Sequence, residues 1–246
     1  MKKYLINIEY DGTNFVGWQY QKNGNSIQGA LQNAFKKLLK EKVIVTGAGR
    51  TDAGVHAVEQ TAHIELKQKI NDKDTFLNSI NFYLKKYPIS ITKVKTKNNK
   101  FHARFSARKR TYEYIIVNRV APPVLAKKRA WHIRKKLSIK LMKKGIKLLI
   151  GTHDFSTFRS SSCGAKSPIK TIEKISVKKN KDKITLKFTS QSFLQNQVRS
   201  MVGCIKYLGD GTWNLNKFKV SFQSKNRIKC APPAPACGLY LLKVNY

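Results

Sequence analysis

The sequence predicts an α+β protein built of two similar domains, and three observations lead to this fold class. Short segments with alternating apolar residues, typical of strands, are separated by longer segments with the apolar spacing of amphipathic helices. In the first hundred residues or so these segments follow the order strand, helix, strand, strand, helix, strand, which is a split β-α-β pattern. The second half of the chain repeats this theme. We therefore predict two β-α-β-β-α-β-like domains, residues 1–105 and 106–246, with a cleft between them.

The first domain shows the alternation of the two periodicities most clearly. In its first strand, Leu5, Asn7 and Glu9 face away from the larger apolar residues between them. Its first helix begins at Ser26, a predicted N-cap, after which apolar residues recur at helical spacing. We predict strands over residues 4–10, 43–45, 58–66 and 89–97, and helices over residues 26–39 and 72–85.

The second domain repeats the pattern with longer connections. We predict strands over residues 111–118, 171–179, 184–188 and 239–246, and helices over residues 137–150 and 193–208. The last helix has one apolar side, formed by Val198, Met201, Val202 and Ile205. We expect this side to be buried.

Charge is the strongest compositional feature of the chain. Lysine and arginine number 49 against 13 aspartate and glutamate residues, so the formal net charge is +36. Such a charge opposes a compact state by self-repulsion, and a polyanionic partner, nucleic acid above all, explains it. A lysine-rich proteome is the alternative explanation, but it does not account for the scarcity of acidic residues.

Several classes of protein are disfavoured by the sequence. No apolar run approaches the length of a membrane span. The four cysteines form no C-x-x-C pair, and the five histidines show no metal-binding spacing. We therefore expect a soluble, cytoplasmic protein with free thiols, with structural or exposed histidines, and with no metal or cofactor.

A glycine-rich loop follows the predicted strand that ends at Val45. Residues 46–56 read TGAGRTDAGVH, so three glycines surround Arg50 and Asp52. Because glycine lets a backbone or a ligand approach closely, this loop can press Asp52 against a substrate with Arg50 nearby. The spacing fits neither a dinucleotide fingerprint nor a phosphate-binding P-loop. A tight turn with a solvated aspartate is the alternative interpretation.

Asp52 is also the best candidate among the few acidic residues. Several others lie beside lysines, in turns before glycine, or at solvent-facing positions of strands. Asp52 alone combines a loop of small residues with a neighbouring guanidinium. No second acid lies close to it in the sequence, so a two-carboxylate hydrolase mechanism lacks its second member.

Two further stretches contain residues suited to RNA. Residues 101–112 alternate aromatic and basic side chains, the combination that stacks unpaired bases and holds phosphates. In this stretch Tyr112 is as well suited to packing in a core as to stacking on a base. Arg199 lies near the start of the predicted helix over residues 193–208, where an arginine either extends to water or pairs with an acid.

These stretches together resemble one family, the tRNA pseudouridine synthases of the TruA type. Residues 47–57, GAGRTDAGVHA, resemble its signature, and residues 101–105 and 110–114, FHARF and RTYEY, resemble its second motif. Residues 193–203, FLQNQVRSMVG, resemble the third motif, and the closing APP and GLYL segments resemble the last. The resemblance extends in order from Tyr4 to Tyr246.

The resemblance implies a fold, a reaction and roles for three residues. It implies the pseudouridine synthase fold, a homodimer, and conversion of uridines 38, 39 and 40 of the tRNA anticodon stem-loop to pseudouridine without cofactor or metal. In it Asp52 is the catalytic residue, Tyr112 meets the target base, and Arg199 pairs with the aspartate. The chemistry itself, rather than the resemblance, leads us to expect that Arg50 occupies the space that the flipped uridine leaves or holds a phosphate.

Two departures and two alternatives accompany the resemblance. Residue 195 is Gln where many relatives have an aromatic residue or His, and residues 234–237, APAC, lengthen the approach to Gly238. Both departures affect the expected wall of the pocket rather than the aspartate. The alternatives are a non-catalytic basic RNA-binding protein and a glycosidase that releases free uracil.

Overall fold

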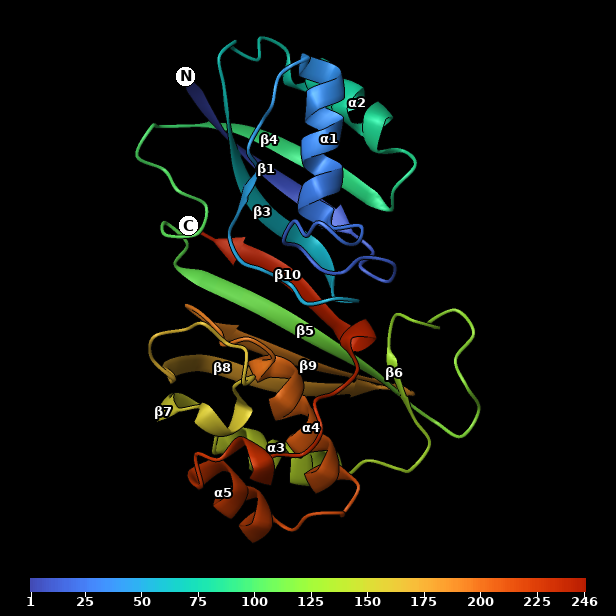
Figure 1. Cartoon of the computed structure of the whole chain (residues 1–246). Coiled ribbons are helices and arrows are strands. Elements are labelled where there is room, and N and C mark those ends of the chain that lie inside the picture. Colours follow the sequence, from blue (N-terminus) through green and yellow to red (C-terminus); the bar gives the residue numbers. More distant parts are fainter. The chain divides into compact units, whose positions relative to one another are not determined.

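The computed structural model describes all residues 1–246, and its contacts divide the chain into two compact units (Figure 1). Unit 1 comprises Met1–Arg108 and Tyr240–Tyr246, and unit 2 comprises Lys109–Leu239. The units differ from the predicted domains mainly at the C-terminus. Residues 240–246 join unit 1 because β10 (Leu239–Asn245) pairs in parallel with β3 (His56–Leu66).

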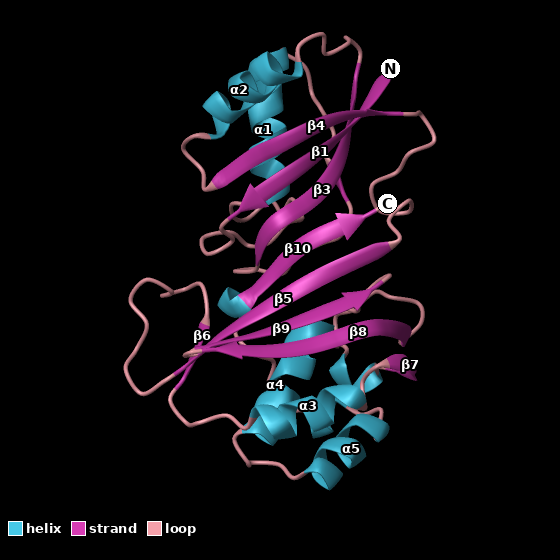
Figure 2. Ribbon diagram, turned by 180° about the vertical axis from the view of Figure 1, so that it is seen from behind, coloured by secondary structure: helices cyan, strands magenta, loops and turns pink.

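Unit 1 consists of a sheet with its helices packed on one face (Figures 1 and 2). The strand order is β4 (Ile89–Lys97), β1 (Lys2–Tyr10), β3 and β10, and the short β2 (Thr46–Gly47) pairs with β3. The helices are α1 (Ile27–Leu39) and α2 (Lys73–Leu84). The predicted order of strands and helices is confirmed, and so is the α+β class. The strand predicted over residues 43–45 is misplaced, because these residues form no strand and the short β2 begins only at Thr46.

The capping and the apolar stripe explain why α1 forms where it does. The Ser26 Oγ accepts a hydrogen bond from the Gly29 N–H at 3.2 Å, as expected of an N-cap. The apolar stripe of α1 is buried, with Leu31 and Phe35 fully enclosed. The helix ends at Lys40, which adopts a left-handed conformation with φ 56°.

The second face of the unit 1 sheet is covered as well. Leu5 and Asn7 of β1 point to this face, and their cross-strand partners on β3 are His63 and Thr61. All four are buried, and the segment after β4 lies against His63. The Ala103 N–H donates to His63 Nδ1 at 3.1 Å and fixes this segment to β3.

Unit 2 also has a sheet with helices on one face (Figure 2). Its antiparallel strands follow the order β5 (Lys109–Asn118), β9 (Lys183–Ser190), β8 (Ile169–Asn180) and β7 (Gly151–Asp154), and β6 (Trp131–Ile133) pairs in parallel with β5. The helices are α3 (Ile139–Lys147), α4 (Gln197–Gly209) and α5 (Leu215–Gln223). Single turns of 3-10 helix lie at Ser156–Phe158, Arg227–Lys229 and Ala236–Gly238.

The structure corrects the predicted elements of unit 2 in several places. The helix predicted over residues 193–208 begins four residues later, at Gln197, because Asn196 has a left-handed backbone with φ 61°. The short strands β6 and β7 and the helix α5 were not predicted. Unit 2 therefore keeps the theme of unit 1 but is not a plain repeat of it.

The expected burial of α4 is confirmed. Val198, Met201, Val202 and Ile205 are all buried, the last three completely. Gly203 lies so close to the following chain that an added Cβ would come within 2.1 Å of the Pro232 carbonyl oxygen.

No helix in the protein has the length and apolar character needed to cross a bilayer.

Candidate active site

The loop that contains Asp52 is fixed on the side that precedes the aspartate. It leaves β2 at Gly47 and is tied back to β3 by two hydrogen bonds. The Ala48 N–H donates to the Thr61 carbonyl at 2.7 Å, and Gln60 Nε2 donates to the Gly49 carbonyl at 3.0 Å. Gln60 is completely buried, so this contact is shielded from water.

Thr51, the residue just before Asp52, is held by two aromatic residues of unit 1. The Tyr10 hydroxyl and Thr51 Oγ1 are 2.8 Å apart, and the backbone N–H of Trp18 donates to the backbone carbonyl of Thr51 at 3.0 Å. All three residues are buried, whereas Asp52 itself is half-buried. The backbone next to the Asp52 carboxylate is therefore held in place by Tyr10 and Trp18.

The loop that contains Gly17 packs closely against the backbone of Thr51 and Asp52, and glycine makes this possible. Gly17 has φ +112°, and an added Cβ would lie 2.7 Å from the Thr51 carbonyl oxygen and 3.2 Å from the Asp52 carbonyl carbon. After the aspartate, the Val55 N–H donates to the Asp52 carbonyl at 3.2 Å, and Gly54 has φ +75°. These conformations are ones that glycine adopts without strain.

Arg50 lies on the same loop but at the surface. Its side chain is exposed, and its Nε donates to Gln19 Oε1 at 2.9 Å. Gln19 follows the Gly17–Trp18 pair that supports Thr51, so one short segment orients both Arg50 and the aspartate loop. An exposed guanidinium held in this way is suited to a phosphate.

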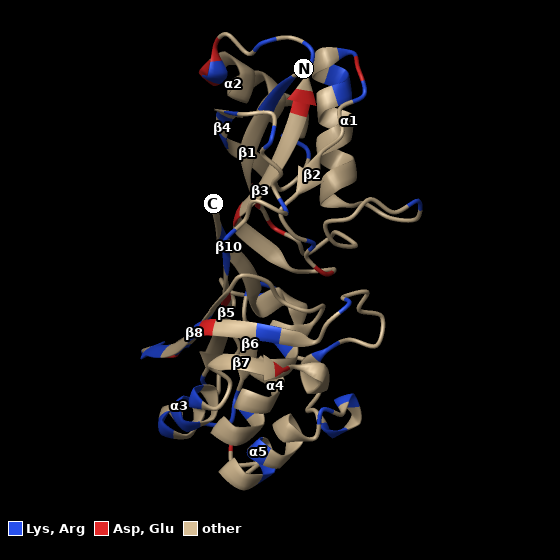
Figure 3. Cartoon of the chain, turned by 90° about the vertical axis from the view of Figure 1, so that its left-hand side faces the viewer, with Lys and Arg blue, Asp and Glu red and all other residues tan.

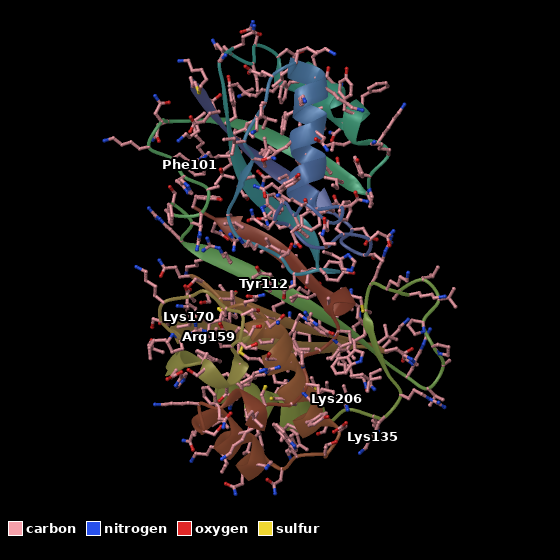
Figure 4. The ribbon with its side chains drawn as sticks, in the orientation of Figure 1. Phe101, Tyr112, Lys135, Arg159, Lys170 and Lys206 are labelled. Carbon is pink, nitrogen blue, oxygen red and sulfur yellow. The ribbon has the colours of Figure 1, made fainter.

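Tyr112 lies on β5 of unit 2 and is labelled in Figure 4. Its ring is 8% exposed and meets the ring of Phe193 edge to face, with centroids 5.2 Å apart and planes at 88°. Phe193 belongs to the segment that leads into α4. The small exposed fraction is compatible with both interpretations of Tyr112, core packing and contact with a base.

Arg199 is half-buried near the start of α4 and is held within unit 2. Its Nε donates to the Ala234 carbonyl at 2.8 Å, and its Nη1 donates to Asn196 Oδ1 at 3.1 Å. The Ala234 N–H in turn donates to the Arg199 carbonyl at 2.9 Å. The guanidinium is thus oriented by hydrogen bonds rather than extended freely into water.

The two departures from the family pattern occupy different environments. Gln195 has an exposed side chain, and its carbonyl accepts from the Ser160 N–H at 3.1 Å. Ala234, in the lengthened segment, orients Arg199, and the Pro235 carbonyl next to it accepts from the Tyr114 hydroxyl at 2.7 Å. Burial raises the pKa of Tyr114, so this hydroxyl stays a donor.

His56 and His63 have structural roles, as predicted. His56 is buried, accepts the Gly12 N–H on its Nδ1 at 3.1 Å and stacks on Tyr240 with centroids 4.7 Å apart. His63 holds the segment after β4, as described above. No group of three or more histidine, cysteine, aspartate or glutamate side chains is arranged to hold a metal ion.

The predicted site residues therefore form two sets, each fixed within its own unit. Asp52 and Arg50 share one loop of unit 1, and Tyr112 and Arg199 are positioned by β5 and α4 of unit 2. Reasoning from the sequence missed the supporting residues Tyr10 and Gly17. The only signal for them was the mixture of glycine and aromatic residues in the loop after β1.

Comparison with known proteins places these features in one family. The tRNA pseudouridine synthase family model matches residues 6–106 and 146–246. The tRNA pseudouridine synthase A of Pelagibacter ubique is 56% identical over 246 residues, and those of Parvibaculum lavamentivorans and Xanthobacter autotrophicus are 45% and 43% identical. Each comparison covers the whole of both chains. The chain belongs to the tRNA pseudouridine synthase family.

Proposed function

We propose that this protein isomerises uridine to pseudouridine at positions 38, 39 and 40 of the tRNA anticodon stem-loop, with Asp52 as the catalytic residue. One observation carries the proposal: the chain matches, over its full length and at 56% identity, a protein named tRNA pseudouridine synthase A. The hydrogen bonds that hold the loop around Asp52 in place support the assignment of Asp52 as the catalytic residue. The net charge of +36 supports a polyanionic substrate.

The proposed reaction needs a carboxylate and little else from the protein. The bond between N1 of uracil and C1′ of the ribose breaks, the base turns, and C5 bonds to C1′. N1 gains a proton and C5 loses one, so the composition of the RNA is unchanged and no redox step occurs. Asp52 either adds covalently to the base or sugar or accepts a proton as these bonds change.

The charges around the site fit these tasks. A half-buried carboxylate loses part of its hydration, which disfavours its ionised form. We propose that Arg199 offsets this loss by pairing with Asp52 in the working enzyme. We propose that Arg50 holds a phosphate or fills the space left by the flipped uridine, and that Tyr112 meets the flipped base.

We further propose that the protein works as a homodimer in the cytoplasm. The dimer is carried over from the family resemblance. The four cysteines are free thiols, which suits a reducing compartment.

Substitution of Tyr112 is expected to affect rate more than stability. Stacking on an aromatic ring is worth about 1–3 kcal/mol per base, so Tyr112→Ala should weaken target engagement by roughly ten- to a hundredfold, whereas Tyr112→Phe should keep much of it. Single-turnover rate and melting temperature, measured on both variants, check this expectation. If the hydroxyl takes part in proton transfer, Tyr112→Phe will bind normally and lose rate.

Tyr207 offers a matched control for this experiment. It makes a similar edge-to-face pair with Trp213, with centroids 5.3 Å apart and planes at 87°. Tyr207→Ala should lower the melting temperature and leave the single-turnover rate unchanged. If Tyr112→Ala behaves in the same way as this control, Tyr112 is a core residue.

Arg199→Met is expected to lower activity and to move the acidic limb of the pH–rate profile upward. Without the guanidinium, the ionised form of Asp52 is less favoured, so a higher pH is needed to populate it. We expect a loss of about 10²-fold, as for other charged groups that stabilise a reacting centre. The dependence of kcat/KM on pH measures both effects.

Arg227→Met is the control for this substitution. Arg227 also contacts α4, through a 3.0 Å hydrogen bond from its Nη1 to Ser200 Oγ, but it has no proposed role in the reaction. Its pH–rate profile should match that of the wild type. An Arg199→Met profile that also matches the wild type would refute the pairing with Asp52.

The positions of modification can be tested with designed tRNAs. Transcripts that keep a single uridine at position 38, 39 or 40, with other nucleotides at the remaining two, are incubated with the purified protein. The proposal predicts pseudouridine in each of the three transcripts and none in a transcript that lacks all three uridines. Modification of that last transcript would place the target elsewhere.

A further inference from the structure

Phe105 is the most exposed aromatic residue of the chain. Its ring is 77% exposed and lies in the segment between β4 and β5, which also carries Phe101, labelled in Figure 4. Burying a phenylalanine side chain stabilises a fold, and most of that stabilisation is absent here. A single exposed apolar residue needs no explanation by itself, so the residues around Phe105 must show whether its ring is suited to binding a ligand.

The turn that presents Phe105 is rigid. Six consecutive backbone N–H groups, from residue 101 to residue 106, all have hydrogen-bond acceptors. His102 organises them: its Nδ1 accepts from the N–H groups of Arg104 and Phe105 at 3.2 and 3.4 Å, and its carbonyl accepts from the Ser106 N–H at 2.8 Å. The Tyr246 hydroxyl donates to the Ala103 carbonyl at 2.9 Å and ties the turn to the C-terminus.

One face of the Phe105 ring is supported by a ladder of aromatic rings. The centroids of His102 and Phe105 are 4.3 Å apart, with planes at 31°. Behind His102 the ladder continues to His63 on β3 at 4.8 Å and from His63 to the buried Phe101 at 6.3 Å. The last two contacts are edge-on, with planes at 62° and 82°, so Phe105 is the exposed end of a row of ring contacts whose other end is in the core.

The hydrogen bond from Ala103 to His63 is retained at neutral pH. The pKa of His63 is lowered to about 4, first by burial and then by the nearby His102 and Lys3, with a smaller opposing effect of Glu65. His63 is therefore neutral above this value, and its Nδ1 remains an acceptor for the Ala103 N–H.

The surroundings of the ring are cationic. The guanidinium of Arg104 lies 5.6 Å from the Phe105 ring centroid, and Lys97 Nζ lies 5.0 Å from that of Phe101. Lys100 and Arg108 on either side of the turn are exposed. Figure 3 shows how strongly lysine and arginine outnumber acidic residues over the chain.

We propose that Phe105 is a platform on which an unpaired base of the tRNA substrate stacks, while the neighbouring cations hold the adjoining phosphates. A preorganised aromatic face beside cations is the arrangement that binds unpaired bases with little sequence preference. This inference rests on the proposed function for the identity of the RNA.

The base held by Phe105 is not the uridine that reacts at Asp52. Thr51, the neighbour of Asp52, is hydrogen-bonded to Tyr10, which pairs with Ala57 of β3, whereas the Phe105 turn is fixed to β3 at His63, six residues further along the strand. At about 3.3 Å per residue, the two attachment points are roughly 20 Å apart. Phe105 therefore binds a second nucleotide and contributes to tRNA affinity rather than to the chemical step.

Tryptophan fluorescence tests the stacking directly, and Phe82 supplies a matched control. Phe82 on α2 is 60% exposed and also has a cation over its ring, Lys85 Nζ at 4.3 Å. The fluorescence of Phe105→Trp, after subtraction of the wild-type signal, should be quenched by a full-length tRNA transcript but not by a blunt duplex RNA without unpaired bases. Phe82→Trp should respond to neither RNA.

Alanine substitutions measure the contribution to binding. Phe105→Ala should raise the Kd for tRNA by about ten- to a hundredfold with an unchanged melting temperature, and Phe82→Ala should leave the Kd unchanged. Because the readout is Kd rather than turnover, a failure of the proposed isomerase reaction would not be mistaken for a failure of this site.

Three results would overturn the proposal. The first is a wild-type Kd in Phe105→Ala, and the second is an equal loss of affinity in Phe82→Ala or for the blunt duplex. The third is a change in oligomeric state, measured by sedimentation, on substitution of Phe105, which would assign the ring to contact with a second copy of the chain.

Discussion

Asp52→Asn is expected to fold, to bind tRNA with nearly wild-type affinity, and to lose turnover by about 10²- to 10⁴-fold. The amide preserves the size and shape of the side chain, and the hydrogen bonds at Thr51 and Gly49 that hold the loop are left unchanged by the substitution. What is lost is the nucleophile or base. Single-turnover formation of pseudouridine at saturating enzyme measures the loss without interference from binding.

Asp182→Asn is the control for this variant. Asp182 is an exposed residue of unit 2 beside Arg119, so its substitution makes the same change of charge away from the aspartate loop. It should keep the wild-type rate. An Asp52→Asn variant with a rate near that of the wild type would refute the catalytic assignment.

Gly17→Ala is expected to reduce the rate by up to about 10²-fold although Gly17 has no side chain to contribute. The new Cβ would lie 2.7 Å from the Thr51 carbonyl oxygen, so the loop that carries Asp52 must move. A displacement of about 1 Å in a catalytic group can cost this much in rate. The φ of +112° adds strain of about 1–3 kcal/mol, which should appear as a lower melting temperature.

Two other glycines separate the steric effect from backbone strain. Gly211 also has a positive φ, +77°, but an added Cβ would meet nothing within 4 Å. Gly164 has neither a positive φ nor a neighbour within that distance. Gly211→Ala should therefore lose some stability and keep its rate, and Gly164→Ala should be neutral. A Gly17→Ala variant with the stability loss of Gly211→Ala and no loss of rate would show that Gly17 does not position Asp52.

The parts of the fold that could be predicted are those encoded by local patterns. The stripe of α1 and its cap at Ser26 are visible in thirteen or so consecutive residues, because helix periodicity and capping are local properties. The pairing of β10 with β3 joins residues that are far apart in the sequence, and no local pattern specifies it. The start of α4 was misplaced because Phe193 and Leu194 continue the apolar pattern, whereas the left-handed Asn196 interrupts the helix.

The same distinction applies to the candidate site. Asp52 could be chosen from the sequence because small residues surround it and few other acids compete with it. The residues that hold the aspartate loop could not be predicted, because the contacts of Tyr10 and Trp18 with Thr51 depend on tertiary structure. The hydrogen bonds of Arg199 with Ala234 likewise depend on a segment some 35 positions later in the chain, which the sequence marked only as a departure.

The central claim, isomerisation of uridine in tRNA, is tested most directly by tritium release. In tRNA labelled with tritium at C5 of uridine, formation of the bond from C5 to C1′ expels the label into water. We predict that the purified protein releases tritium from such tRNA without releasing free uracil. Tight binding of the tRNA without tritium release would indicate a non-catalytic RNA-binding protein, and release of free uracil would indicate a glycosidase; either result would contradict the account.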